Sequence, residues 1–204
     1  GPGARLAYYD GFGTVPTAFS DDAGDALGIR YATPSISGFT AAASYHPNGS
    51  TEGANDTGHG IASNGAGGPR HVYSIGANYS GEFSGATVQI GADYTAADNS
   101  AAREVWSVGG LVGYTGFSLG VHYESNEAAN SEDIAVGAQY RTGPWTVAGG
   151  YAFSDVPGPN DIDSFGGWVT YALAPGVALA AGLEYGDDGT TSAYNAMSYL
   201  AINF

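Results

Sequence analysis

The stretch that decides the fold is residues 117–154, FSLGVHYESNEAANSEDIAVGAQYRTGPWTVAGGYAFS. Its apolar side chains recur at every second position, as Phe117, Leu119, Val121 and Tyr123 do at its start. Small or polar residues fill the positions between them. A period of two predicts strands with one apolar face, and the polar runs predict the connections. The stretch therefore predicts three consecutive strands of an antiparallel sheet.

The same alternation recurs along the chain and predicts eleven strands. Their expected ranges are 26–32, 38–46, 70–80, 84–95, 103–115, 117–125, 132–142, 144–154, 162–173, 177–185 and 194–204. Short turns at 33–37, 81–83, 115–116, 142–143 and 174–176 alternate with longer polar loops at 47–69, 96–102, 126–131, 155–161 and 186–193. Long strands with short turns on one side and longer loops on the other are typical of an antiparallel transmembrane β-barrel.

Composition excludes several classes of protein. The 204 residues include five Arg, no Lys and 20 acidic residues, for a net charge of −15, so nucleic-acid binding is not expected. The absence of Cys excludes disulfides and thiol chemistry. With 12% charged and 43% hydrophobic residues the chain is expected to fold, as a single domain over 1–204. No apolar run approaches the length that a transmembrane helix needs.

The non-apolar face of the strands is small and polar, which suits a water-filled interior better than a soluble exterior. The apolar face would then contact lipid. Charged or titratable candidates for lining the interior are Arg30, Asp93, His122, Glu124, Arg141 and Glu184.

Aromatic residues gather at the two ends of the apolar face and predict two membrane-interface girdles. Those beside the longer loops are Tyr45, Tyr94, Tyr123, Phe153 and Tyr185. Those beside the short turns are Phe39, Tyr79, Tyr114, Phe117, Tyr140, Trp145 and Tyr171. At about 3.3 Å per residue and a tilt of about 40°, the girdles would lie roughly 15–20 Å apart, near the apolar band of about 25 Å in such barrels.

Two segments carry a resemblance to a known family. Residues 26–45, ALGIRYATPSISGFTAAASY, and the final residues 193–204, AYNAMSYLAINF, resemble general diffusion porins of Gram-negative outer membranes. The resemblance is to the sixteen-stranded, trimeric kind found in alphaproteobacteria. It implies that residues 1–25 are the remnant of a constriction loop and that 26–204 form strands six to sixteen.

The resemblance also implies roles for individual residues. Arg30 and Arg141 would be wall arginines at the narrowest point, opposite acidic residues of the constriction loop, for which Asp21, Asp22 and Asp25 are candidates. Phe204 would be the assembly signal. A complete twelve-stranded barrel, with a further strand over 4–9, is the alternative to a C-terminal part of a larger porin.

The expected function is a water-filled outer-membrane channel for passive diffusion of small hydrophilic solutes and ions, with a preference for cations. The expected partners are the lipid bilayer, lipopolysaccharide and two further copies of the chain. A non-conducting barrel for binding or envelope anchoring and a soluble carbohydrate-binding protein are the alternatives. We expect no enzyme activity, because no nucleophile, base and orienting group share a recognisable arrangement.

No metal spacing or cofactor motif is apparent, and no cofactor is expected. The acidic residues of the loops leave open Ca²⁺ or Mg²⁺ ions that bridge to lipopolysaccharide. These residues are Glu52, Asp56, Asp98, Glu127, Glu132, Asp133, Asp155, Asp161, Asp187 and Asp188.

Overall fold

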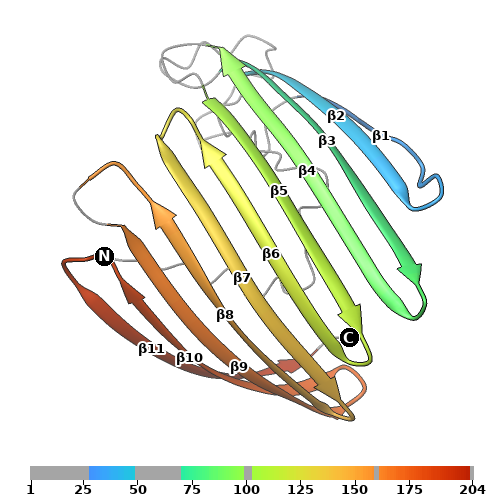
Figure 1. Ribbon diagram of the computed structural model, residues 1–204, viewed down its shortest axis with the longest axis vertical. Helices are drawn as coiled ribbons and strands as arrows, with labels where there is room; N and C mark the ends of the chain where they lie inside the picture. Colours follow the sequence, from blue (N-terminus) through green and yellow to red (C-terminus); the bar gives the residue numbers. More distant parts are fainter. Residues whose placement is uncertain (1–27, 49–69, 99–102, 159–160, 203–204) are drawn as a thin grey trace.

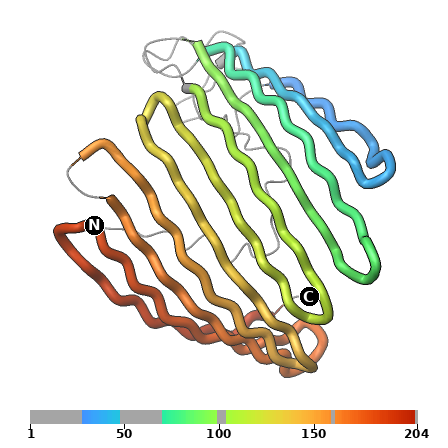
Figure 2. The backbone as a smooth tube through the Cα atoms, in the orientation of Figure 1, coloured from blue at the N-terminus to red at the C-terminus, as the bar shows by residue number. Residues whose placement is uncertain are grey.

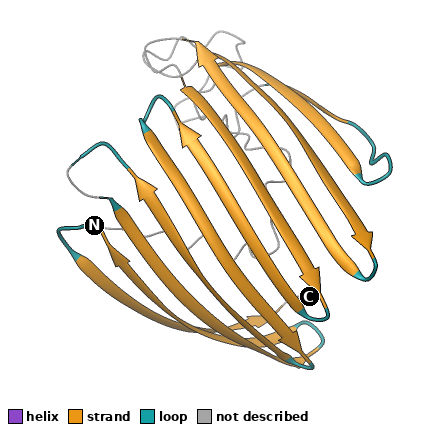
Figure 3. Cartoon of the chain, in the orientation of Figure 1, coloured by secondary structure: helices purple, strands orange, loops and turns teal. Residues whose placement is uncertain are grey.

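A computed structural model describes residues 28–48, 70–98, 103–158 and 161–202 of the protein. In this part of the chain, eleven strands form a single sheet in which every strand pairs antiparallel with its neighbours in sequence (Figure 1). No helix occurs among the described residues (Figure 3). The prediction of eleven antiparallel strands is confirmed, and one sheet contains all of them.

The strands are long, most of them ten residues or more. Their bounds are β1 Ile29–Ala32, β2 Phe39–Asn48, β3 Arg70–Phe83, β4 Ala86–Asp98, β5 Arg103–Tyr114, β6 Phe117–Asn126, β7 Ser131–Thr142, β8 Trp145–Asp155, β9 Ile162–Ala174, β10 Val177–Asp187 and β11 Ser192–Ile202. The predicted ends differ from these by no more than three residues. All the tight turns lie at one end of the sheet, and the longer connections lie at the other (Figure 3).

One predicted turn is misplaced. Residues 81–83 belong to β3, and the turn to β4 is formed by Ser84 and Gly85, both with positive φ (51° and 82°). Ser37 with Gly38, and Thr115 with Gly116, adopt the same pair of left-handed conformations. Two left-handed residues give the type I′ turn whose twist matches that of a hairpin. The position of the two left-handed residues determines where the chain turns. The two-residue alternation of side chains continues along the strand up to that point.

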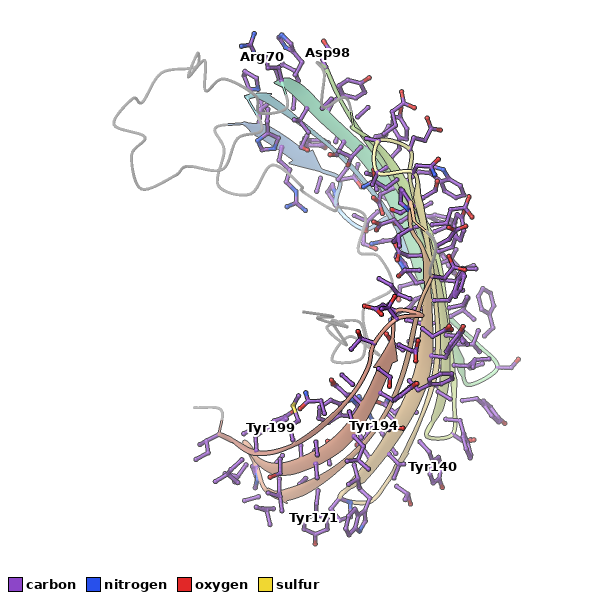
Figure 4. All side chains as sticks on the ribbon, turned by 90° about the vertical axis from the view of Figure 1, so that its left-hand side faces the viewer. Arg70, Asp98, Tyr140, Tyr171, Tyr194 and Tyr199 are labelled. Atoms are coloured by element: carbon purple, nitrogen blue, oxygen red, sulfur yellow. The ribbon has the colours of Figure 1, made fainter. Side chains whose placement is uncertain are left out.

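The sheet curves into an open trough with a concave and a convex face (Figures 2 and 4). The register sorts side chains between the faces: Leu119 pairs with Val112 and Ala138, while its neighbour Gly120 pairs with Leu111 and Gly137. Figure 4 shows Tyr140 and Tyr171 projecting from the convex side. The residues that the strand register aligns with Tyr140 and Tyr171 therefore form the convex face, and the residues between them form the concave face.

Large apolar side chains on the convex face are exposed. Members of the central part of this face are Ile75, Ile90, Val112, Leu119, Val121, Val147, Leu179 and Leu183, each between 49% and 69% exposed. An apolar surface of this extent on a soluble monomer would be a liability, and it fits contact with another apolar phase. The buried residues lie mainly on the concave face of β2 to β5, where Ser44, Ser74, Thr95 and Ser107 are examples.

Aromatic side chains on the convex face stack across neighbouring strands in two belts. Near the tight turns the ring centroids of Phe39 and Tyr79, Phe117 and Tyr140, and Trp145 and Tyr171 lie 4.6, 4.2 and 4.6 Å apart. Near the longer connections Trp106 packs on Tyr123 at 4.9 Å and Tyr185 on Tyr194 at 4.8 Å. By register, all twelve aromatic residues named from the sequence have convex-face positions. The belts also contain Tyr73, Trp106, Tyr151, Phe165 and Tyr194, which were not named from the sequence.

The two faces should respond differently to a charge. Val136 is 40% exposed on the convex face, and the adjacent Ala135 lies on the concave face. We expect Val136→Arg to lower the free energy of unfolding by about 2–4 kcal/mol, because the guanidinium would enter the apolar phase. Ala135→Arg should cost much less. Urea unfolding of the protein in lipid vesicles measures both, and equal losses would contradict the assignment of the faces.

The tight turns offer a second test. At Gly116, with φ +87°, a Cβ would lie 2.5 Å from the carbonyl oxygen of Arg141 on the adjacent hairpin. At Gly143, with φ +52°, a Cβ would meet nothing within 4 Å. Alanine strains the backbone by about 1–2 kcal/mol at either position. Gly116→Ala should therefore destabilise the protein by about 1 kcal/mol or more beyond Gly143→Ala, because it adds overlap. The same unfolding assay compares the two variants. A larger loss of stability in Gly143→Ala than in Gly116→Ala would contradict this prediction.

Candidate functional site

Acidic side chains form a row across the concave face. Register places Asp93 of β4 opposite Ser107 of β5, Ser107 opposite Glu124 of β6, and Glu124 opposite Asp133 of β7. Ser154 of β8 continues the row opposite Asp133. We call these five residues the acidic row. Three carboxylates, on β4, β6 and β7, thus lie along one cross-strand row of the wall.

Serine hydroxyls hold two of these carboxylates in place. Ser107 Oγ donates a hydrogen bond to Asp93 Oδ1, and Ser154 Oγ donates one to Asp133 Oδ1. Asp93 is only 6% exposed, whereas Glu124 and Asp133 are half-buried. Glu124 and Asp133 are direct cross-strand partners, an arrangement that is unfavourable for two anions without a cation nearby.

The row contains residues that sequence analysis assigned differently. Asp133 was counted among the loop acids, but it lies inside β7 on the concave face. Asp93 and Glu124 were predicted to line the interior, and the register places them on this face. His122 lies beside the row, opposite Gly109 and Ala135. The alternation of the predicted strand 132–142 already put Asp133 on the same face as Arg141, although Asp133 was also counted among the loop acids.

The two candidate wall arginines lie far apart. Arg30 is on β1 opposite Ser44, close to the level of the acidic row. Arg141 is at the tight-turn end of β7, where its backbone N–H donates to Gly116 O at 2.8 Å. With the Gln139 amide oriented so that its oxygen faces Arg141, that oxygen accepts from Arg141 Nε at 3.0 Å. The structure therefore does not bring the two arginines together.

A tryptophan on the concave face was not singled out from the sequence. Trp168 of β9 pairs with Ala148 on one side and Gly182 on the other, both of which have concave-face positions. Glu184, a predicted lining residue, lies on the same face opposite Gly166 and Asn195. The alternation Ser164, Gly166, Trp168 could have indicated this position, because the three residues share one parity.

Other expected site residues lie outside the described part of the chain. These are Asp21, Asp22, Asp25 and Phe204, together with a possible strand over 4–9. Within the described ranges, the side chains of no three His, Asp or Glu residues form a group that could hold a metal ion. No helix in those ranges is long and apolar enough to cross a membrane.

The adjacent acids Asp187 and Asp188 stabilise a turn. Asp187 Oδ1 accepts from Gly189 N at 2.7 Å. Asp188 Oδ1 accepts from the backbone N–H groups of Thr191 and Thr190, at 2.6 and 3.0 Å. These bonds favour the charged carboxylate, so they hold the pKa of Asp188 below its usual value. Both carboxylates thus have a structural role in the connection between β10 and β11.

These features together define a class of protein. A curved antiparallel sheet with an apolar convex face, two aromatic belts and a polar concave face is the wall of a membrane-spanning β-barrel. The sequence profile of the Gram-negative porins matches residues 3–191, and the chain belongs to this family. The family is one of outer-membrane proteins, and the location of this chain is the outer membrane. We refer to the concave face as the lumen wall from here on.

Solved porins share the fold at low sequence identity. A refined porin structure aligns with TM-score 0.58 and 14% identity, over 84% of this chain and 60% of that one. A variant of the Rh. blastica porin aligns with TM-score 0.62 and 16% identity, over 87% and 55%. An anion-selective porin from Comamonas acidovorans aligns with TM-score 0.56 and 14% identity, over 86% and 55%. The chain thus spans 55–60% of the length of these porins. No curated protein matches it at a significant level.

The three tryptophans of the chain provide a test of the lumen assignment. Trp106 and Trp145 are 40% and 47% exposed on the convex face, and Trp168 lies on the lumen wall. Brominated acyl chains should quench the fluorescence of the first two and spare Trp168. In the double variant Trp106→Phe with Trp145→Phe, quenching by lipid should fall close to zero while aqueous acrylamide still quenches. Lipid quenching that persists in this variant would show that Trp168 lies on the convex face, and it would contradict the lumen assignment.

Proposed function

We propose that this protein forms the wall of a water-filled outer-membrane channel that passes small hydrophilic solutes by diffusion and prefers cations. Diffusion needs no catalytic group, only a lumen whose lining sets the size and charge of the solutes that pass. The acidic row carries the proposal, because its register aligns three carboxylates across β4 to β7 on the lumen wall.

The balance of charge on the lumen wall supports the same preference. Among the described residues whose register gives this face, the acidic residues are Glu82, Asp93, Glu124, Asp133 and Glu184, and the basic residues are Arg30, Arg103 and Arg141. Arg141 lies at the tight-turn end, away from the acidic row. A potential of one sign in a narrow, low-dielectric passage raises the local concentration of the opposite ion. Cations should therefore be enriched beside β4 to β7.

The outer rim of the wall suggests how the channel contacts its surroundings. On the convex face, Glu132 pairs with Asp155 and Asp163 with Asp187, near the longer connections. The proposed partners are the bilayer, lipopolysaccharide and, from the family resemblance, two further copies of the chain. A Ca²⁺ or Mg²⁺ ion shared between these rim acids and a lipid phosphate would relieve the repulsion within each pair. The protein needs no resident cofactor for this function.

Measurement of ion selectivity tests the proposal. The porin is extracted from outer membranes and its reversal potential is recorded in planar bilayers across a KCl gradient. We expect K⁺ to be more permeant than Cl⁻. The triple variant Asp93→Asn, Glu124→Gln, Asp133→Asn should lower the permeability ratio several-fold, because it removes the fixed charge of the acidic row.

A matched variant controls for net charge. Glu132→Gln, Asp155→Asn and Asp163→Asn remove three charges from the convex face, and this variant should retain most of the selectivity. An ohmic channel that prefers anions, or equal effects of the two triple variants, would rule out selection by the acidic row. Absence of any conductance would overturn the channel itself and favour a binding or anchoring barrel.

A further inference from the structure

Trp168 lies against the lumen wall at a position that is shaped to receive its ring. It is midway along β9, and its partner on β10 is Gly182. A Cβ on Gly182 would overlap the six-membered ring of the indole, at Cε3, Cδ2 and Cζ3. The ring therefore covers the backbone of β10 where a side chain would otherwise stand. The ring thus packs against the wall at Gly182, and Trp168 is half-buried, so part of its surface stays exposed.

The ring has small neighbouring residues on β8, β9 and β10, and larger, polarisable side chains follow on β11. Cross-strand and diagonal neighbours on the lumen wall toward β8 and within β9 and β10 are Ala148, Gly150, Gly166 and Ala180. Beyond Gly182, β11 contributes Met197, opposite Gly182, and Tyr199, opposite Ala180. Met197 and Tyr199 are 40% and 46% exposed. We call Trp168, Met197 and Tyr199 the lumen platform.

A carboxylate lies beside the platform. Glu184 is two residues from Gly182 on β10, so it is a diagonal neighbour of Trp168, at about 7–8 Å between backbones. Asn195 Nδ2 donates to Glu184 Oε2 at 3.4 Å, which orients the carboxylate across β10 and β11. A carboxylate thus neighbours a half-buried indole on the lumen wall.

The chemistry of this arrangement selects one class of ligand. The face of an indole carries negative quadrupole density and attracts cations, and quaternary ammonium groups bind best to such faces. The indole N–H is covered by protein and has no acceptor among the described residues, so the exposed part of the ring cannot offer this donor to a ligand. A sugar or another ligand that needs the N–H has no access to it. Anions are disfavoured by Glu184.

We propose that the lumen platform, with Glu184, is a binding site for small organic cations that carry a quaternary ammonium group. This inference rests on the proposed cation-preferring channel. It names a class of solute that binds inside the lumen while it passes through the channel. The platform lies on β9 to β11, whereas the acidic row lies on β4 to β8. The two features can therefore be disabled separately.

The test uses choline chloride as the probe in planar bilayers that contain the porin extracted from outer membranes. Choline should reduce the K⁺ current with a saturable concentration dependence. Trp168→Leu should raise the half-blocking concentration about fivefold, the equivalent of a cation–π contribution of about 1 kcal/mol. Trp168→Phe should restore part of the block. Trp145→Leu, which removes a convex-face indole, should leave the block unchanged.

A second variant keeps the indole and moves it. Gly182→Ala introduces the Cβ that overlaps the ring, so it should weaken the block without loss of the tryptophan. Glu184→Gln should weaken it by a similar factor. Retention of the folded, heat-modifiable gel mobility confirms that each variant has assembled.

The outcomes separate this inference from the proposed function. A choline block that is equal in wild type, Trp168→Leu and Gly182→Ala overturns the binding site even if the channel is cation-selective. A block that depends on Trp168 supports the site even if the reversal potential shows no preference for K⁺ over Cl⁻. Glucose that competes with choline at equal concentration would identify a sugar site instead and overturn the inference.

Discussion

The rest of this structure depends on the need to pair every backbone polar group away from water. Hydrocarbon offers no partner to a backbone N–H or C=O group, so a sheet that crosses a bilayer has to pair its strands along their whole length. The continuous ladders from β1 to β11 meet this requirement. Because pairing fixes the backbone, only the alternation of side chains is left to distinguish lipid from lumen. The apolar convex face and the polar lumen wall are the result.

This constraint explains how much could be predicted from the sequence. The eleven strands and their order follow from period two and from turn residues, both of which are local features. The turn at Ser84 and Gly85 was placed too early because residues 81–83 are compatible with a turn. The pair of left-handed conformations at Ser84 and Gly85 decides the position. Strand ends near the longer connections were also placed too early, because polar residues such as Asp98 and Asp187 continue the ladder beyond the apolar band.

The lining of the lumen was less accessible to sequence analysis because it depends on register between strands. Asp93 and Glu124 were identified one by one, but their alignment with Asp133 required the pairing of β4 to β7. The separation of Arg30 from Arg141 follows from the same register. Trp168 was missed for a different reason, since the aromatic residues singled out were those at the two ends of the apolar face. Only its pairing with Gly182 shows that a ring fits on the lumen wall.

The neighbour-to-neighbour order of the strands has a consequence for how the barrel folds. Every pairing in the described sheet joins strands that are adjacent in sequence, and most are joined by connections of a few residues. Hairpins of this kind form in about 1–10 μs, so the sheet can grow one strand at a time with little loss of chain entropy. In the described sheet, β1 and β11 each have one edge that no described strand pairs. Pairing of such an edge with a strand distant in sequence should be slower than growth by hairpins, because the entropy of a large loop is lost first.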